Sequence, residues 1–321
     1  MIRAVLDAVA PQVSIITETN VPHKDNISYF GNGRNEAQMV YNFSLPPLML
    51  HTFHTGQTTE LSQWAASLET PSDEVTFFNF LASHDGIGVT PAKGILSETA
   101  VANMAVRIEK LGGHVSYRSQ PDGSQSPYEL NINFLDALGD PEQPDEDVSL
   151  IAQRFLASQT MMLALQGVPG IYFHSLFGSR NWTDGVAQNG RFRTINRQKL
   201  SRQALERELA DAQHLRYLVF SGYRHLLAQR RQQKAFHPNG TQEILSCHES
   251  VFALLRTSPN GRSTILCLHN AANKPVQLTL NQAILAIFNG KQQDLISGEF
   301  IRNSNLHGLT LASYQCLWLA K

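Results

Sequence analysis

Cysteine, net charge and long apolar runs are all scarce in this sequence, and each scarcity excludes a class of protein. The three cysteines, Cys247, Cys267 and Cys316, are odd in number and lie far apart, which argues against a disulfide framework or a zinc site. We therefore expect reduced thiols in a cytoplasmic protein. The formal net charge of −1 offers no basic surface for nucleic acid. No apolar run approaches the roughly 20 residues of a membrane span, so no membrane association is expected.

Targeting and cofactor signals are missing as well. Residues 1–10 predict an amphipathic helix and lack the cationic start and cleavage site of an export signal. No metal-ligand cluster or cofactor motif stands out, so we expect neither a metal nor a cofactor. The partners that remain are small polar molecules.

The sequence does contain enough apolar residues, 42%, for a large core in its 321 residues. Before residue 235, short apolar runs alternate with helical stretches, which predicts an α/β domain with a parallel sheet over residues 1–234. After it, short strands predict an antiparallel β domain over residues 235–321. Within the first domain, residues 112–146 form an insertion rich in Gly, Ser, Pro and Asp that we expect to be mostly loop.

The predicted elements follow from the periodicity of the apolar residues. The expected strands of the first domain are 13–17, 75–81 and 168–173, with a further strand near 40–55; its helices are 36–68, 99–111, 147–165 and 203–232; the strands of the second domain are 243–246, 251–257, 263–269, 275–280 and 309–319.

Two carboxylates close apolar runs of the first domain. Glu18 ends the run at 13–17, and Asp85, preceded by His84, ends the run at 75–81. Catalytic side chains of parallel α/β sheets lie at these strand ends. Glu18, partly desolvated by its strand, is expected to favour its neutral form and donate a proton. A solvated or ion-paired Glu18 is the structural alternative.

Two carboxylates at one edge of a sheet suit glycoside chemistry, in which a proton donor and a charge stabiliser flank the reacting sugar carbon. The rival interpretation of a His-Asp pair is a metal-dependent phosphohydrolase. It is disfavoured because His84 and Asp85 end a strand and no further histidine ligand is suitably placed upstream.

Several longer motifs carry a family resemblance. The stretches ITETNVPHKDNISYFG, FLASHDGIG, SPYELNINFLDALGDP, QGVPGIYFHSLFGSRNW and GRFRTINRQKL resemble the sucrose phosphorylase group of the α-amylase (glycoside hydrolase) superfamily, which includes glucosylglycerate and sucrose-6-phosphate phosphorylases. The resemblance implies a (β/α)8 TIM barrel with an insertion after the seventh strand and an all-β C-terminal domain. It also implies a hexosyltransferase that moves glucose from an α-glucoside to inorganic phosphate.

The resemblance assigns roles to residues of this sequence. Glu18 corresponds to the general acid/base, Asp85 to the transition-state stabiliser and His84 to a contact with a substrate hydroxyl. Tyr128 and Glu129 lie in the loop that shapes the acceptor and phosphate site. Sucrose-specific members carry an amide at the position of Glu129, which puts sucrose in doubt as the substrate.

Four further positions are candidates for substrate contact. Arg193 and Arg197 suit hydroxyl or phosphate oxygens, and their alternative is solvated charge on a loop. Asn20 and His23 follow Glu18 and either line the acceptor site or stabilise a turn.

One part of the family's pattern is missing. The group's nucleophile is an aspartate that ends the fourth barrel strand, and the first residues here resemble the helix after that strand. Asp7 lies only 11 residues before Glu18, too close for a crossover between parallel strands, and is expected on a helix surface. We therefore expect the C-terminal half of a barrel and a retaining phosphorylase fragment that is inactive alone. Its partner would be a separate N-terminal half.

Two other functions stay open. The chain could be a noncatalytic remnant or a subunit that completes its barrel with another polypeptide, or it could derive from a hydrolase or transglycosidase of the same superfamily.

Overall fold

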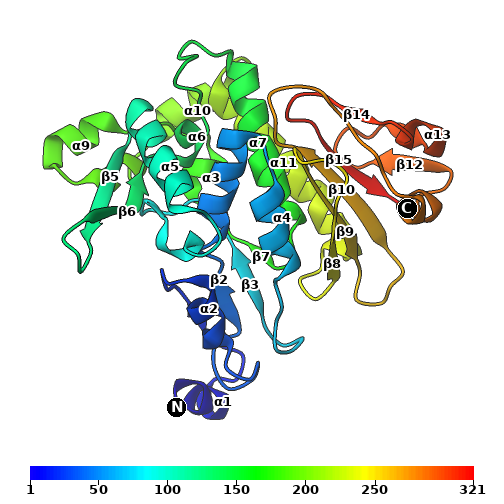
Figure 1. Ribbon diagram of the computed structural model, residues 1–321, viewed down its shortest axis with the longest axis horizontal. Coiled ribbons are helices and arrows are strands. Elements are labelled where there is room, and N and C mark those ends of the chain that lie inside the picture. The colour runs from blue at the N-terminus through cyan, green and yellow to red at the C-terminus, as the bar shows by residue number, and fades with distance from the viewer.

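A four-stranded parallel sheet, its helices and a six-stranded antiparallel sheet make up the fold (Figure 1). The computed structural model describes residues 1–321, apart from the side chains of residues 303 and 305. The parallel sheet has the order β1-β2-β3-β7, with strands β1 (Ile16–Thr17), β2 (Met39–Tyr41), β3 (Thr76–Asn79) and β7 (Val168–Pro169). All three strand pairs are parallel, which confirms the predicted sheet type. In residues 1–321 its edges are β1 and β7.

The parallel strands are shorter than expected. Strand β1 has two residues because the chain before it pairs irregularly: the amide of Ile15 donates to the Gln38 side chain instead of to a backbone carbonyl. Strand β7 ends at Pro169, which has no N–H for the ladder. The strand expected near 40–55 is β2, which begins one residue earlier.

Longer helices lie between these strands in the chain or, for the last two, follow β7. They are α3 (Leu45–Thr55), α4 (Thr59–Ala66), α5 (Glu98–Lys110), α7 (Val148–Ala164), α10 (Arg202–Ala210) and α11 (Leu215–Gln232). The predicted helices 99–111 and 147–165 correspond closely to α5 and α7. The helix predicted at 36–68 is wrong, because this range holds β2 and two helices separated by Gly56, which has a positive φ of 70°. The helix predicted at 203–232 is also two helices, α10 and α11, because His214 caps the start of α11.

The insertion is not mostly loop, which corrects that part of the prediction. Strands β5 (His114–Ser119) and β6 (Gln125–Asn131) form a hairpin, and β6 also pairs with β4 (Ile87–Gly88). Gly123, with φ of 84°, allows the tight turn between β5 and β6. The composition of this segment alone had suggested loop. This hairpin brings the residues around Glu129 against the chain that follows Asp85.

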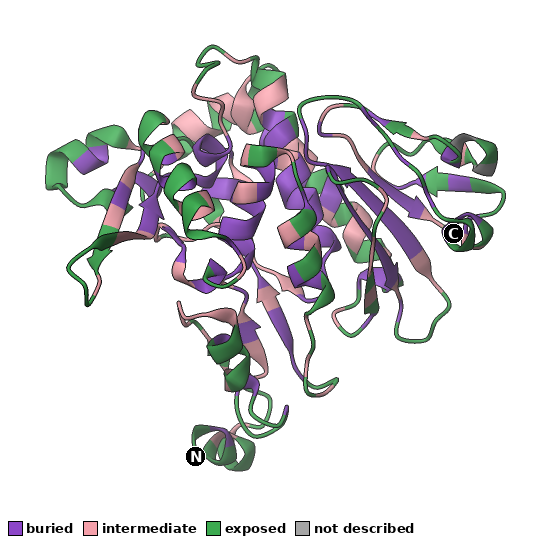
Figure 2. Cartoon of the chain, viewed as in Figure 1, coloured by how far each residue is buried: buried purple, intermediate pink, exposed green. Residues whose placement is uncertain are grey.

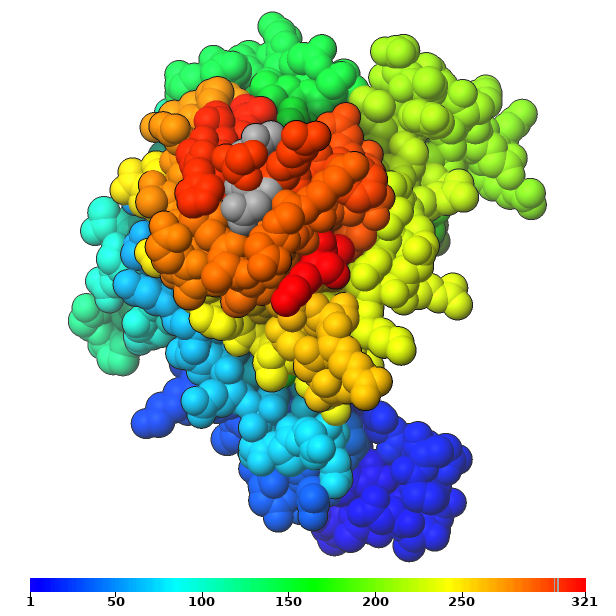
Figure 3. All heavy atoms as spheres, turned by 90° about the vertical axis from the view of Figure 1, so that its right-hand side faces the viewer, coloured from blue at the N-terminus to red at the C-terminus, as the bar shows by residue number. Residues whose placement is uncertain are grey.

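The C-terminal residues form the predicted antiparallel β structure. The main sheet has the order β13-β12-β15-β10-β9-β8, and β11 pairs with β14 beside it. These strands are β8 (Thr241–Leu245), β9 (Val251–Thr257), β10 (Thr264–Asn270), β11 (Val276–Gln277), β12 (Lys291–Asp294), β13 (Phe300–Arg302), β14 (Thr310–Leu311) and β15 (Cys316–Ala320). Strands β12 and β13 were not predicted, because β12 consists of polar residues and β13 has only three residues. Figure 3 shows this β domain, orange to red, on the opposite part of the molecule from the N-terminal helix.

Short elements complete the chain. They are α1 (Ile2–Val9), α2 (His23–Asn26), α6 (Phe134–Ala137), α8 (Phe173–Leu176), α9 (Thr183–Asn189), α12 (Gln282–Ile287), α13 (Asn303–Leu306) and the 3-10 helices η1 (Ile27–Phe30), η2 (Thr90–Ala92), η3 (Phe192–Asn196) and η4 (Lys234–Phe236).

The largest core lies where the helices meet the β domain. Helix α7 is buried along most of its length, packs against α11 and contacts strand β10 (Figure 2). Its first turn is capped by Asp147, whose carboxylate accepts from the amides of Ser149 and Leu150. The three cysteines are free thiols. None of the helices among the described residues combines the length and apolar character needed to cross a membrane.

Helix α1 is amphipathic as predicted, and most of it is exposed. Ile2, Val5 and Val9 are 72%, 56% and 74% exposed, and Arg3 is its one buried residue among those described. Asp7 lies on the helix surface, as predicted, and is paired with Arg3. The apolar face of α1 is therefore uncovered by the described residues.

Candidate active site

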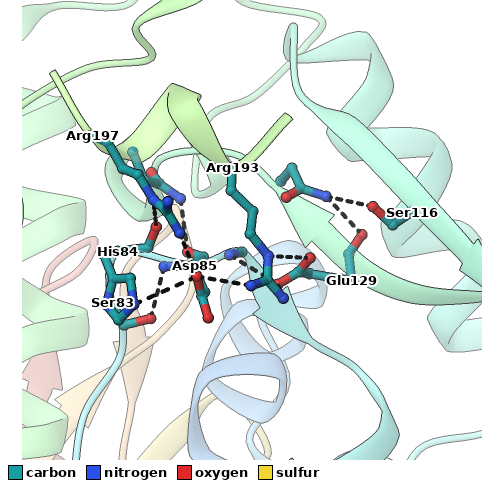
Figure 4. A network of polar contacts seen from close by, with 10 residues as sticks. Ser83, His84, Asp85, Ser116, Glu129, Arg193 and Arg197 are labelled. Atoms are coloured by element: carbon teal, nitrogen blue, oxygen red, sulfur yellow. Dashed lines mark hydrogen bonds and ion pairs between the residues drawn. The ribbon is translucent and has the colours of Figure 1, made fainter. Parts of the chain in front are cut away.

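Asp85 lies in the loop after strand β3 and forms ion pairs with two arginines. Its carboxylate is 3.1 Å from Nη1 of Arg193 and 2.7 Å from Nη2 of Arg197 (Figure 4). The side chain is 30% exposed, so the group is neither sealed off nor freely solvated. Asp85 is thus a half-buried carboxylate held between two guanidinium groups.

Arg193 bridges Asp85 to Glu129 of the hairpin. Its Nε donates to one oxygen of Glu129 at 3.1 Å, and its Nη2 lies 3.0 Å from the other. Glu129 also accepts a hydrogen bond from the amide of Gly86 at 3.2 Å, and its side chain is only 7% exposed. The hydrogen bond to Glu129 raises the pKa of Arg193. A buried carboxylate without a cation would be costly, so Arg193 is required where Glu129 is buried.

Arg197 fixes the backbone next to Asp85 as well as its carboxylate. Its Nε donates to the carbonyl of His84 at 2.8 Å, while Nη2 reaches Asp85. The ring of His84 is 60% exposed, with Nε2 3.7 Å from Asp85. Arg193 and Arg197 are 45% and 44% exposed, so both keep an edge toward solvent. The structure thus brings His84, Asp85 and Glu129 together with both predicted arginines.

Two residues of this cluster escaped the sequence analysis. Asn196 is buried, and its amide donates to the carbonyls of Asp85, at 3.0 Å, and Ile132, at 3.2 Å. The hydroxyl of Tyr172, which follows β7, donates to the carbonyl of Asn196. Burial and the charge of Asp85 raise the pKa of Tyr172, against the effect of Arg197. Both residues lie in the motifs quoted above, but neither carries the charge that made the arginines candidates for substrate contact.

Aromatic side chains connect the surroundings of Glu18 with those of Asp85. Tyr41 packs on Phe78 and Phe80, with ring centroids 4.6 and 5.1 Å away, and Phe80 and Asp85 line one small pocket. Burial and then the charge of Glu18 raise the pKa of Tyr41. The side chain of Glu18 is exposed, so the expected desolvation is wrong. It follows edge strand β1, and the described residues place nothing over it.

The chain after Glu18 reaches strand β4, which follows Asp85. A Cβ at Gly88 would lie 2.6 Å from the amide nitrogen of Asn20, so this glycine is required for the contact. Gly88 pairs with Glu129 in the sheet. Asn20 is therefore close to the cluster, its contact with the acceptor site stays a prediction, and its Oδ1 is buried without a partner among the described residues.

His23 and Tyr128 differ in their relation to the cluster. The ring of His23 stacks on Phe77 at 6.3 Å and meets Trp64 of α4 edge-on at 6.1 Å, and burial lowers its pKa. The ring of His23 therefore packs against the helix layer, and its contact with the acceptor site stays a prediction. The carbonyl of Tyr128 accepts from Val89, and its phenol adds to the raised pKa of Arg193, so Tyr128 lies beside the cluster. Across the described residues, no three His, Cys, Asp or Glu side chains gather as a metal site would require.

Solved structures share this fold with the chain. A sucrose 6F-phosphate phosphorylase from Thermoanaerobacter thermosaccharolyticum superimposes with a TM-score of 0.67 over 94% of this chain and 55% of its own, at 18% identity. An α-amylase from H. orenii matches with a TM-score of 0.61 over 99% of this chain and 55% of its own, at 17% identity. The chain therefore shares its fold with about half of each of these two structures. No protein-family model matches the chain.

Sequence similarity narrows this class. The chain is 45% identical to a glucosylglycerate phosphorylase of Spirochaeta thermophila over 99% of its own length and 54% of that protein. It is 40% identical to that of Escherichia coli over 99% of its length and 55% of the relative, and 22% identical to a sucrose phosphorylase of Streptococcus mutans. The chain spans about half the length of the curated relatives it matches. The resemblance is confirmed: this chain is a relative of the sucrose phosphorylase group.

Proposed function

We propose that the chain forms one side of the active site of a retaining glucoside phosphorylase that acts on glucosylglycerate. The observation that carries the proposal is the convergence of Arg193 and Arg197 on Asp85, at the end of a strand in an α-amylase-type sheet. Two half-exposed guanidinium groups beside a carboxylate can hold both the hydroxyls of a sugar and an anionic group. The similarity to glucosylglycerate phosphorylases supports the choice of substrate.

The proposed chemistry is a double displacement. A nucleophilic carboxylate attacks the sugar C1 and breaks the bond to the glyceryl oxygen, which takes the proton of Glu18. An oxygen of phosphate then attacks C1, displaces the carboxylate and gives up its proton to Glu18. The product is glucose 1-phosphate of the same anomeric configuration, while Asp85 stabilises the positive charge that develops on the sugar ring in both steps.

The anionic partners of this reaction suit the local charge. Glycerate carries a carboxylate and phosphate is a dianion, whereas fructose is neutral. Because Glu129 holds Arg193 in place and Asp85 holds Arg197, both outer guanidinium edges can meet an incoming anion. Charged glycerate therefore suits Arg193, held in place by Glu129, better than the neutral fructose of sucrose. The resemblance likewise puts sucrose in doubt as the substrate.

We infer that the nucleophile belongs to residues corresponding to the part of the relatives that this chain does not match. The parallel sheet has edges at β1 and β7, and Ile16 of β1 is 43% exposed. The apolar face of α1 is also uncovered. We therefore expect the chain to be inactive alone and completed by further barrel strands packed against these surfaces. A reducing, cytoplasmic setting is part of the same proposal.

Mixing tests this proposal. Purified chain, alone and with the part of a glucosylglycerate phosphorylase that it does not match, is incubated with phosphate and either glucosylglycerate or sucrose, and glucose 1-phosphate is measured. We expect product in the mixture only, with preference for glucosylglycerate. Turnover by the chain alone would refute the inference about the nucleophile. A stable mixture that releases free glucose would indicate a hydrolase, and one that binds sugar without turnover a noncatalytic subunit.

A further inference from the structure

Tyr172 follows strand β7, which lies beside the strand that leads to Asp85. Strands β7 and β3 are parallel neighbours, with Asn79 opposite Pro169. Tyr172 comes three residues after Pro169, and Asp85 comes six residues after Asn79. Because parallel strands end at the same edge of a sheet, the segments that carry Tyr172 and Asp85 leave the sheet at one edge.

The hydroxyl of Tyr172 holds the peptide group that joins Asn196 to Arg197. It donates to the carbonyl of Asn196 at 2.6 Å. The N–H of the same peptide group, which belongs to Arg197, donates to the carbonyl of Thr194 at 2.9 Å. The last carbonyls of a helix lack partners within it, and Asn196 ends η3. The peptide group is therefore held at both ends, and one of the two hydrogen bonds depends on Tyr172.

The two residues joined by this peptide group fix the chain at Asp85. The side-chain amide of Asn196 donates to the carbonyl of Asp85 at 3.0 Å. Arg197 donates from Nε to the carbonyl of His84 at 2.8 Å and from Nη2 to the Asp85 carboxylate at 2.7 Å (Figure 4). The backbone on both sides of Asp85 and its carboxylate thus all depend on this segment.

Tyr172 acts on Asp85 through these residues. A phenol has one proton to donate, and that of Tyr172 goes to the carbonyl of Asn196. Burial raises the pKa of Tyr172, so the phenol keeps this proton. The charges of Arg197 and Asp85 also act on this pKa, in opposite directions, which places both groups near the hydroxyl. Tyr172 therefore lies close to Asp85 but spends its proton on the segment that holds it.

We propose that Tyr172 is a positioning residue that keeps the carboxylate of Asp85 oriented for the charge that develops on the sugar ring. The inference rests on the proposed function, in which Asp85 stabilises that charge. A preorganised carboxylate contributes most in the transition state, because it does not have to be reoriented as the charge develops. Loss of the Tyr172 hydroxyl therefore acts on kcat more than on KM.

Hydrogen exchange in the chain alone tests whether Tyr172 holds Arg197. The Nε–H of Arg197 donates to the carbonyl of His84, so its exchange with solvent reports how often this contact opens. Tyr172→Phe removes the hydroxyl and keeps the ring. We expect NMR to show exchange of this proton accelerated about fivefold, the effect of one hydrogen bond. Tyr217→Phe, at an exposed position of α11, should leave the exchange unchanged.

Kinetics test the consequence for Asp85. The mixture of the chain with the part of a relative that it does not match serves as the completed enzyme. We expect Tyr172→Phe to lower kcat with glucosylglycerate and phosphate about tenfold and to keep both KM values within about twofold. In a chain with Arg197→Gln, the same substitution should lower kcat by at most about threefold, because one of the side chains through which it acts is lost. Tyr217→Phe should keep the wild-type kcat.

Failure of this inference and failure of the proposed function give different results. An inactive mixture with the wild-type chain refutes the proposed function, and the role of Tyr172 in catalysis with it. Three results with an active mixture overturn this inference alone. They are unchanged exchange at Arg197 in Tyr172→Phe, an unchanged kcat, and a tenfold loss that persists in the Arg197→Gln chain. A rise in KM at constant kcat would likewise overturn it, because Tyr172 would then act on binding.

Discussion

Arg193 shows how single residues organise the candidate active site. One guanidinium connects Asp85, after strand β3, to Glu129, on a hairpin some forty residues later. The pair is favourable because Glu129 is buried and its charge would otherwise be unpaired. The exposed half of Arg193 remains for a ligand. A structural ion pair and a binding function thus share one side chain.

Asn196 supplies a test of how this arrangement is held. Asn196→Ala leaves the carbonyls of Asp85 and Ile132 without their donor, so the free energy of unfolding should fall by about 1–3 kcal/mol. Urea unfolding measures the change. Asn103→Ala, at an exposed position of α5, is the matched control and should change stability by less than about 0.5 kcal/mol. Equal effects of the two substitutions would contradict a supporting role of Asn196.

Glu18 has a distinct kinetic signature if it is the acid/base. In the completed enzyme, Glu18→Gln should slow cleavage of substrates with poor leaving groups by about 10²–10⁴-fold. Activated substrates such as nitrophenyl glucosides, which leave without a proton, should be largely spared in the first step. Asp85→Asn, by contrast, should impair both kinds of substrate. Steady-state rates on the two substrates decide; a uniform loss for Glu18→Gln would argue against the acid/base role.

The residues that sequence could and could not predict differ in what surrounds them. Asp85, Glu129, Arg193 and Arg197 are charged residues in long motifs, and the structure places them within one cluster. The exposure of Glu18 was not predictable, because burial depends on what packs over an edge strand. Asn196 carries no charge, and only the two carbonyls that it bridges reveal its position.

At the scale of elements, close packing between β4 and the loop after β1 joins the two ends of the candidate site. Gly88 has an ordinary backbone conformation, so its constraint is purely one of space: a Cβ would lie 2.6 Å from the Asn20 amide. Gly88→Ala should lower the free energy of unfolding by about 1–3 kcal/mol through this clash. Urea unfolding of the variant gives the value.

A double-mutant cycle isolates the contact. Asn20→Ala removes the obstructing amide, so in its presence Gly88→Ala should cost at least about 0.5 kcal/mol less than in the wild-type chain. Additive effects of the two substitutions would mean that Asn20 does not pack against β4.

Long periodic elements were predictable and short ones were not. Helices α5 and α7 present regular apolar faces, and their bounds agree with prediction to within one residue. Strands β5 and β6 lie among turn residues and alternate only weakly, so composition suggested loop. Helix α7 packs between α11 and the β domain, and this long-range contact, not local propensity, explains why it is buried on most sides.

On the scale of the whole molecule, the alternation of strand and helix followed by short strands predicted the two-part architecture. What joins the parts is a core in which helix side chains such as Phe155 and β-domain side chains such as Trp318 lie in one cluster. Stability should therefore depend on groups buried in the β domain as much as on the parallel sheet.

His269 makes this stability dependent on pH. Its buried ring donates from Nδ1 to the carbonyl of Phe252 and accepts at Nε2 from the indole of Trp318, so both nitrogens are satisfied only in the neutral form. Burial lowers its pKa from 6.5 to about 4, although the hydrogen bond to Phe252 opposes the shift. Between these two values the unfolded chain binds a proton that the folded chain does not, so stability falls as pH decreases.

We expect the free energy of unfolding to decrease by up to about 1.4 kcal/mol for each pH unit from His269 alone as pH falls from 6.5 toward 4. His54, lowered to about 3, should add a similar slope. His269→Gln can still donate to Phe252 and accept from Trp318 but does not titrate, so urea unfolding at several pH values should show the slope reduced by one proton. His307→Gln, at an exposed position, should leave the slope unchanged. If His269→Gln leaves the slope of the unfolding free energy against pH unchanged, then protonation of His269 on unfolding does not cause that slope.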